Sequence, residues 1–328
     1  MTGDGVDIAA GRGNAARTEP SARQWPDVRD LYESVSNWGR WGPDDQRGAL
    51  NLITRERVAA AARLVVEGRH VGCGRVDETP SPLNSHPPSH HMLAAGDVHQ
   101  RGCGFATDYL GFAPHGATTT HIDALCHVFF DGVMYNGHPA SRVASTGAQV
   151  NSIAALADGV TTRGVLLDIP ALRGVDYLDP GISVHAAELE AAASAAGVEP
   201  GPGDALIVHV GREPRRQALG VDAEMTETGA LNLPGLDADC LPWLHERGIA
   251  MLASDGGNDA LPWPQVRERL PIHVGCMVFM GVHLIDNLYT ERLVDACREF
   301  GRWQFLFTVA PLTFQRATGS VVNPTAVF

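Results

Sequence analysis

The 328-residue chain contains no lysine, so every fixed positive charge on its side chains comes from arginine. Its 25 basic residues face 38 acidic ones, which gives a formal net charge of -13 at pH 7. Proteins that bind nucleic acid gather basic residues on one surface to contact phosphates. This acidic balance therefore argues against a nucleic-acid partner.

Long hydrophobic runs are also missing. No apolar stretch approaches the roughly 20 residues that a membrane-spanning helix needs, and Met1 to Arg23 lacks the apolar segment of a signal peptide. We therefore expect no membrane insertion. Residues 1–23 are rich in Gly, Ala, Ser and Thr, which predicts a flexible N-terminal tail.

Two further absences bear on chemistry. No two of the six cysteines form a CxxC pair, and several lie in apolar surroundings, which favours reduced, buried thiols and a cytoplasmic location. The sequence has no Gly-x-Ser-x-Gly motif, so it gives no support to a hydrolase built on a serine nucleophile elbow. The cysteines are Cys73, Cys103, Cys126, Cys240, Cys276 and Cys297.

What the chain does have is ample material for a core, because 44% of its residues are hydrophobic and only 19% are charged. Strand and helix patterns alternate over its second half, which is typical of an α/β domain. The expected strands are 164–169, 204–210, 249–253 and a strand-rich segment 303–314, and the expected helices are 183–196 and 237–247. We predict one domain over residues 24–328.

The first half gives two local predictions. Thr54 has the pattern of an N-cap for a helix over 55–67 that Gly68 ends. Residues 78–104 read as a long irregular segment, which is typical of a lid or a partner-contacting arm. Its three histidines, His86, His90 and His91, are best interpreted as solvated surface side chains.

The segment His121-Ile-Asp123 carries the first indication of chemistry. If it is extended, its imidazole and carboxylate lie on one face, because side chains alternate along a strand. Imidazole and carboxylate together suit a transition metal. A plain structural hydrogen bond is the alternative. His127, four residues further on, reaches the same spot if the chain turns into a helix.

A second polar group lies downstream, where His273 precedes the apolar run 274–282 and Asp286 follows it. Charged side chains are rarely fully buried unless they are paired or bound to a metal. The sequence alone leaves a structural role and a site role open for both.

Together these segments resemble the putative cyclase family, which includes bacterial kynurenine formamidases and isatin hydrolase. The family's hallmark is His-x-Gly-Thr-His-x-Asp-Ala-Pro-x-His, and residues 120–127 read Thr-His-Ile-Asp-Ala-Leu-Cys-His in register. Residues 41–54, 131–137 and 317–324 are similar to other parts of the larger members. The resemblance spans about residues 35–328.

The resemblance implies a swivelling β/β/α fold assembled as a homodimer or homotetramer. It implies that His121 and Asp123 ligate one divalent metal ion, Zn²⁺ or Mn²⁺, and that a later histidine and acidic residue, here His273 and Asp286, complete the site. His127 would be the catalytic acid and base.

Two departures from the family pattern concern the ligands. Ala117 occupies the position of the family's first histidine, and His115 is a candidate substitute two residues earlier. Asp286 replaces the expected glutamate and is one methylene shorter. These changes favour a single metal with an altered ligand set.

The predicted activity is hydrolysis of a small amide, formamide, lactam or lactone by metal-activated water. Trp41, Phe105 and Tyr135 are candidates for binding this small-molecule substrate, with core packing as the alternative for each. Two other functions stay open: a biosynthetic cyclase or lyase on the same scaffold, and a metal-free binding protein that has lost catalysis. The loop 254–259 follows an expected strand and is either near the site or a plain turn.

Overall fold

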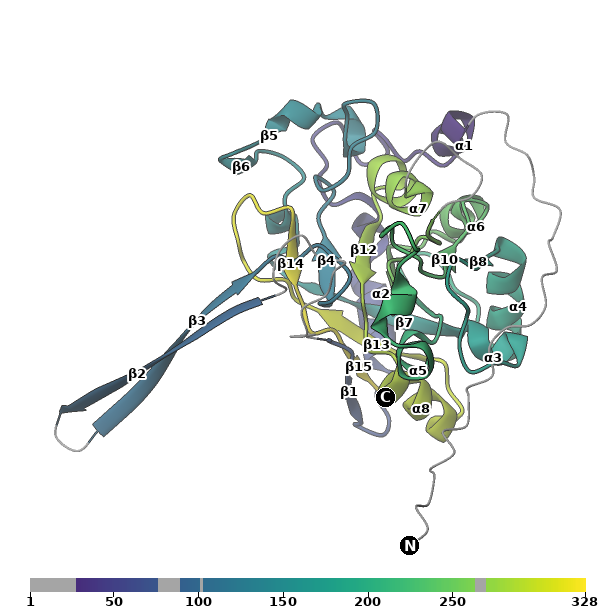
Figure 1. The fold of residues 1–328 in the computed structure, drawn as a ribbon. Helices are drawn as coiled ribbons and strands as arrows, with labels where there is room; N and C mark the ends of the chain where they lie inside the picture. Colours follow the sequence, from purple (N-terminus) through teal and green to yellow (C-terminus); the bar gives the residue numbers. More distant parts are fainter. Residues whose placement is uncertain (1–27, 76–88, 101–102, 263–269) are drawn as a thin grey trace, which may run out of the picture.

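The computed structural model describes residues 28–75, 89–100, 103–262 and 270–328, without the side chains of 89–100 and 103–105 (Figure 1). The expected tail over residues 1–23 and His86 lie outside the described residues, as do the side chains of His90, His91, Cys103 and Phe105. The other five cysteines are buried and unpaired. No helix in the described ranges has both the length and the apolar character to cross a membrane.

Nine strands form the central sheet: β1 (His70–Gly72), β4 (His121–Asp123), β7 (Val160–Asp168), β9 (Ala205–His209), β11 (Met251–Ser254), β12 (His283–Asp286), β13 (Gln304–Val309), β14 (Gly319–Val321) and β15 (Thr325–Val327). Their order is β1-β15-β13-β7-β9-β11-β12-β4-β14. The inner group β7, β9, β11 and β12 is parallel, and the other pairs are antiparallel. The mixed α/β class predicted from the sequence is confirmed.

The parallel strands are buried on both faces, so they read as continuous apolar runs in the sequence. Alternate residues enter two separate cores, because successive side chains point to opposite faces. Leu167, Leu206 and Leu252 pack on one face with the helical segments. Leu166, Ile207 and Ala253 pack on the other.

Eight α-helices are described: α1 (Val28–Ser34), α2 (Arg55–Ala62), α3 (Ile169–Arg173), α4 (Ala186–Ala196), α5 (Arg212–Leu219), α6 (Cys240–Arg247), α7 (Pro271–His273) and α8 (Glu291–Phe300). A π-helix, η6 (Val274–Met280), continues α7, and 3-10 turns occur at η1 (Gly48–Leu52), η2 (Tyr135–Gly137), η3 (Ala140–Arg142), η4 (Ile153–Leu156) and η5 (Val221–Glu224). Helices α4 and α6 and the π-helix pack in the first core, and α8 packs in the second.

The predicted N-cap is confirmed, because the Thr54 side chain accepts a hydrogen bond from the backbone N–H of Arg57. The helix that follows is shorter than expected and ends at Ala62 rather than at residue 67. Only Ala61 of this helix is buried, so little packing holds its last turn in place.

Three short sheets lie outside the main one: β5 (Val143–Ala144) with β6 (Gly147–Ala148), β8 (Ser183–Val184) with β10 (Gly235–Leu236), and β2 (Ser89–Gln100) with β3 (Cys103–Phe112). The last pair forms a long hairpin that extends away from the body (Figure 1). The expectation of irregular chain over 78–104 was therefore wrong for both strands. The pattern missed them because a two-stranded ribbon has no core face to impose alternation.

The carboxyl ends of the four parallel strands meet at one edge of the sheet. Asp168 and His209 end β7 and β9 and are register partners, Asp255 follows β11, and Asp286 ends β12. In α/β sheets, this edge is where ligands bind.

Candidate metal centre

Strand β4 carries the predicted His-x-Asp pair and is sandwiched between β12 and β14. Its three residues are fully buried, and register places Asp286 of β12 directly opposite His121. The Nε2 atom of His121 lies 3.6 Å from Oδ1 of Asp123 and 3.9 Å from Oδ2 of Asp286. The segment is extended, which is the condition on which the pairing of His121 and Asp123 depended.

His273 brings a second imidazole to the same place from helix α7. Its Nε2 atom lies 3.7 Å from Oδ2 of Asp123 and 3.4 Å from Oδ2 of Asp286. Two atoms that each bind one ion at about 2.1 Å lie at most about 4.2 Å apart. These separations are therefore compatible with a shared cation.

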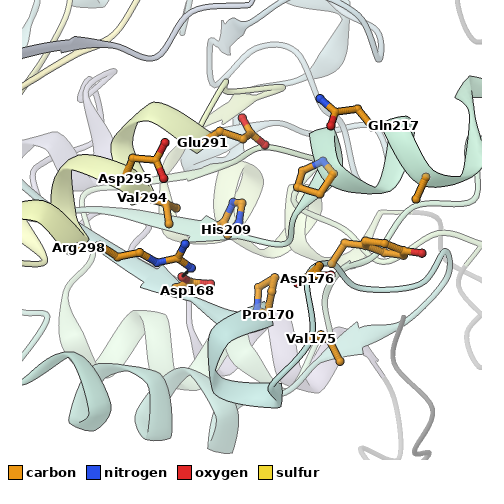
Figure 2. A pocket seen from close by; sticks show the side chains of 13 residues that line it. Asp168, Pro170, Val175, Asp176, His209, Gln217, Glu291, Val294, Asp295 and Arg298 are labelled. Atoms are coloured by element: carbon orange, nitrogen blue, oxygen red, sulfur yellow. Dashed lines mark hydrogen bonds and ion pairs between the residues drawn. The ribbon is translucent and has the colours of Figure 1, made fainter. Parts of the chain in front are cut away.

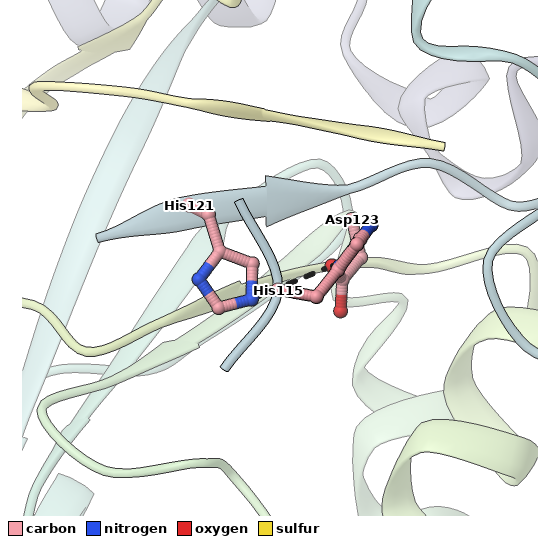
Figure 3. A group of neighbouring side chains, drawn as sticks. All are labelled: His115, His121 and Asp123. Carbon is pink, nitrogen blue, oxygen red and sulfur yellow. Dashed lines mark ion pairs between the residues drawn. The ribbon is translucent and has the colours of Figure 1, made fainter. Parts of the chain in front are cut away.

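His115 lies beside His121 and Asp123, as Figure 3 shows. Its Nδ1 atom lies 2.8 Å from Oδ1 of Asp123, yet both atoms are buried and neither has a partner with hydrogen-bond geometry. Its Nε2 atom contacts the Thr318 hydroxyl at 2.9 Å. Two buried, unsatisfied atoms so close together fit a cation between them, because leaving them unpaired is costly. The residues present thus fit a divalent metal.

Further contacts orient the candidate ligands. Asp259 Oδ2 lies 2.5 Å from Nδ1 of His273, which leaves Nε2 free toward the centre. Asn258 donates to Oδ1 of Asp286 at 2.5 Å, and the Thr119 carbonyl lies 2.8 Å from Nδ1 of His121. Such contacts around the ligands fix their tautomers and ring orientations.

The charges of the cluster shift several pKa values. Burial alone would raise the pKa of Asp123, but its contact with His115 and the charges of the neighbouring histidines lower it. Burial opposes protonation of His273, but Asp286 and Asp259 raise its pKa well above the usual value. The cluster thus favours an ionised Asp123 and a positive charge on His273.

His127 lies beside this group and stacks on His115, with ring centroids 3.5 Å apart and an interplanar angle of 2°. It follows β4 in a turn, not in a helix. Burial lowers the pKa of His127 to about 4. Its ring is therefore neutral at pH 7 and able to accept a proton.

A buried hydrogen-bond network holds the loop between His115 and His121. Arg212 forms a bidentate pair with Glu224 and donates to the Ala117 carbonyl and to Oδ1 of Asn287, both at 2.5 Å. Asn287 donates in turn to the carbonyls of Gly116 and Thr119 at 2.7 and 3.1 Å. Ala117 therefore contributes its backbone to this network, while His115 supplies the nearby imidazole.

The candidates for substrate binding lie in varied surroundings. Tyr135 is fully buried, and its hydroxyl donates to Oδ2 of Asp45 at 3.0 Å. Trp41 is half-buried, packs against the first core and lies under the Arg40 guanidinium. The Phe105 side chain is outside the described part of the chain.

Sequence reasoning missed several residues that support the site. For the loop 254–259, the sequence left open whether it lies near the site or is a plain turn. In the structure, its Asn258 and Asp259 hold two candidate ligands. Thr318 lies in the segment 317–324, which carried part of the family resemblance. Arg212 and Asn287 gave no signal, because only the fold reveals what a buried polar side chain contacts.

Comparison with known proteins identifies the family. A sequence profile described as "Putative cyclase" matches residues 42–258, which is more than half of the chain. Among proteins of curated function, none matches.

Solved structures show the same fold. A structure described as a novel cyclase is 29% identical, with a TM-score of 0.81 over 90% of this chain and 99% of that chain. An isatin hydrolase bound to the product analogue thioisatinate is 17% identical, with a TM-score of 0.58 over 84% and 98%. Isatin hydrolase A from Labrenzia aggregata, bound to benzyl benzoate, is 18% identical, with a TM-score of 0.59 over 79% and 93%. The predicted cyclase fold is confirmed, and the chain belongs to the putative cyclase family.

Proposed function

We propose that this protein is a metal-dependent hydrolase of small amides, formamides, lactams or lactones. The observation that carries the proposal is the convergence of imidazole and carboxylate atoms around Asp123, which belongs both to a group with His115 and His121 and to a group with His273 and Asp286. Such mixed nitrogen and oxygen ligands suit Zn²⁺ or Mn²⁺. The isatin hydrolase structures with this fold support the choice of a cyclic amide as a substrate class.

One divalent ion held by these residues would polarise a carbonyl group and lower the pKa of a water molecule. Asp123 would hold it together with His115 and His121, or together with His273 and Asp286, since Asp123 belongs to both groups of candidate ligands. Asp259 and Asn258 keep His273 and Asp286 in place, so this geometry is formed before substrate binds.

We assign the proton transfers to His127. In its neutral form, a ring nitrogen takes the proton of the attacking water as the new carbon–oxygen bond forms. The same nitrogen then gives that proton to the leaving nitrogen or oxygen as the bond to the carbonyl carbon breaks. Stacking on His115 keeps the ring beside the ligands during both transfers.

Trp41, Phe105 and Tyr135 are proposed to shape the substrate pocket, for which aromatic walls are typical. A homodimer or homotetramer and a cytoplasmic location also stay predictions.

The proposal is tested with Asp123→Asn, assayed for metal content and for hydrolysis of isatin and an N-formylated aromatic amine. We expect loss of bound Zn²⁺ or Mn²⁺ and a fall in kcat/KM of about 1,000-fold or more, because several kcal/mol of electrostatic stabilisation are removed. Asp239→Asn is the matched control, since Asp239 also contacts a histidine but lies outside this centre. Full metal content in Asp123→Asn would remove Asp123 from the ligand set.

A further inference from the structure

A cavity opens at the carboxyl ends of β7 and β9, apart from the cluster around Asp123. Its volume is about 570 Å³, and Figure 2 shows the His209 ring between Glu291 and Asp168. Helix α8 forms one wall, with Glu291, Asp295 and Arg298 spaced so that they share a face. The cavity thus lies between the ends of two strands and the first turns of helix α8.

His209 is 5% exposed and reaches this cavity with one edge of its ring. Its Nδ1 atom lies 2.8 Å from the Thr290 hydroxyl and 3.2 Å from Oδ2 of Asp255. Both of these contacts are made by Nδ1. An imidazole held through one nitrogen presents the other to a ligand.

Asp255 is fully buried and fixed by the backbone. Its two oxygens accept hydrogen bonds from the N–H groups of Val210 and Arg212, both at 2.8 Å. Because its position is set in this way, it holds the His209 ring as Asp259 holds His273.

Glu291 supplies an unsatisfied carboxyl group. Both of its carboxylate oxygens are out of contact with solvent and have no hydrogen-bond partner. Its place in the first turn of α8 is favoured by the helix dipole, but that interaction does not replace the lost hydrogen bonds of a carboxylate. A cation beside Glu291 would do so.

Acidic side chains outnumber basic ones in the cavity wall. Among the described residues that line it, Arg298 is the only basic side chain other than His209, and it is paired with Asp168 at 2.9 Å. Asp176, Asp295 and Glu291 line the same space. A wall of this composition attracts cations and gives them a route to His209.

From these contacts we infer that His209 and Glu291 form a second divalent-cation site, with Asp255 orienting the imidazole and the cavity supplying water ligands. Ligand atoms of the three residues lie within 4.8 Å of one another. This upper bound is compatible with the roughly 4.2 Å that two ligands of one ion span. The imidazole and carboxylate pair suits Mn²⁺ or Zn²⁺.

Another cluster of similar composition gives no support for a metal site. In the group of His185, Asp237 and Asp239, the Asp239 oxygens already contact Nδ1 of His185 at 3.0 Å and the N–H of Ala186 at 3.1 Å. All three residues are partly exposed. Asp239 therefore serves as a control position.

The test counts Mn²⁺ sites on the full chain after chelation, by electron paramagnetic resonance of the unbound ion during titration. We expect two sites per chain in the native protein, one in Glu291→Gln, one in Asp123→Asn and two in Asp239→Asn. Glu291→Gln should keep native hydrolytic activity, because Glu291 does not contact the ligands around Asp123. Its circular dichroism spectrum and melting temperature check that it folds.

Anomalous diffraction from a Mn²⁺-soaked crystal gives a second measurement, with a peak expected between His209 and Glu291. The inference is overturned if the native protein and Glu291→Gln bind the same number of ions, or if Asp239→Asn removes the second site. Two sites in Asp123→Asn would contradict the proposed ligand role of Asp123 and leave the count for Glu291→Gln to decide the second site.

Discussion

Two imidazole–carboxylate pairs, His273–Asp259 and His209–Asp255, are built alike at the same end of the sheet. Each carboxylate is fully buried, accepts two backbone N–H groups and contacts Nδ1 of its histidine. What differs is the surroundings of Nε2. In His273 this atom faces two further carboxylates, whereas His209 borders an open cavity with Glu291 beside it.

The difference indicates that the buried carboxylate at Nδ1 determines where the histidine can bind a ligand. The number of other ligand atoms near Nε2 determines how tightly that ligand is bound. The centre around Asp123 gathers five candidate ligands in a buried place and has a free imidazole, His127, next to them. The second cluster offers fewer ligands and has no such neighbour among its lining residues. We expect the first centre to bind metal more tightly and to be the only one that catalyses.

The largest expected effect comes from removing His127, the imidazole beside the first centre that has no counterpart at the second. His127→Ala should lower kcat by about 100- to 10,000-fold, which is the usual contribution of a positioned acid or base. Metal content should stay unchanged, because His127 is not among the proposed ligands. Steady-state kinetics together with metal analysis check both expectations, and native turnover would show that another group moves the proton.

A smaller effect distinguishes the two carboxylates that orient the histidines, Asp259 and Asp255. Asp259→Asn should weaken metal binding at the first centre by about 10- to 100-fold, because an orienting partner of a ligand histidine is lost. Asp255→Asn should weaken only the second site. Titration of each apo-protein with Mn²⁺ measures both affinities. If either substitution weakened metal binding at both sites equally, Asp259 and Asp255 would not act on separate sites.

The smallest effect concerns the partly exposed pair His185 and Asp239. The hydrogen bond that His185 donates to Asp239 raises the pKa of His185, so the contribution of this pair to stability is present below about pH 6.5 and lost as the pH rises through the raised value. Asp239→Asn should therefore reduce the loss of stability between pH 6 and 8. The change should be below about 1 kcal/mol, or about 2 °C in Tm. An unchanged pH dependence would show that this pair adds nothing to stability.

Local patterns identified much of the fold and part of the site. Thr54 capped its helix as predicted, and β7, β9 and β11 lie where continuous apolar runs indicated buried strands. His121 and Asp123 share a strand, so their relation is set by the alternation of side chains and is readable without the fold. The hairpin β2–β3 was missed because its pairing depends on a partner strand, not on a local pattern.

The sequence by itself determined the class of the fold, the acidic character of the chain and the imidazole–carboxylate pair of β4, since each depends on composition or on neighbours along the chain. Only the tertiary structure decided that His115 lies against Asp123 beside Ala117, and that Asp259 and Asn258 orient His273 and Asp286. The contacts of Asp259 and Asn258 join residues 14 and 28 positions apart in the chain. Their geometry arises when parallel strands bring their carboxyl ends together, which no local pattern encodes.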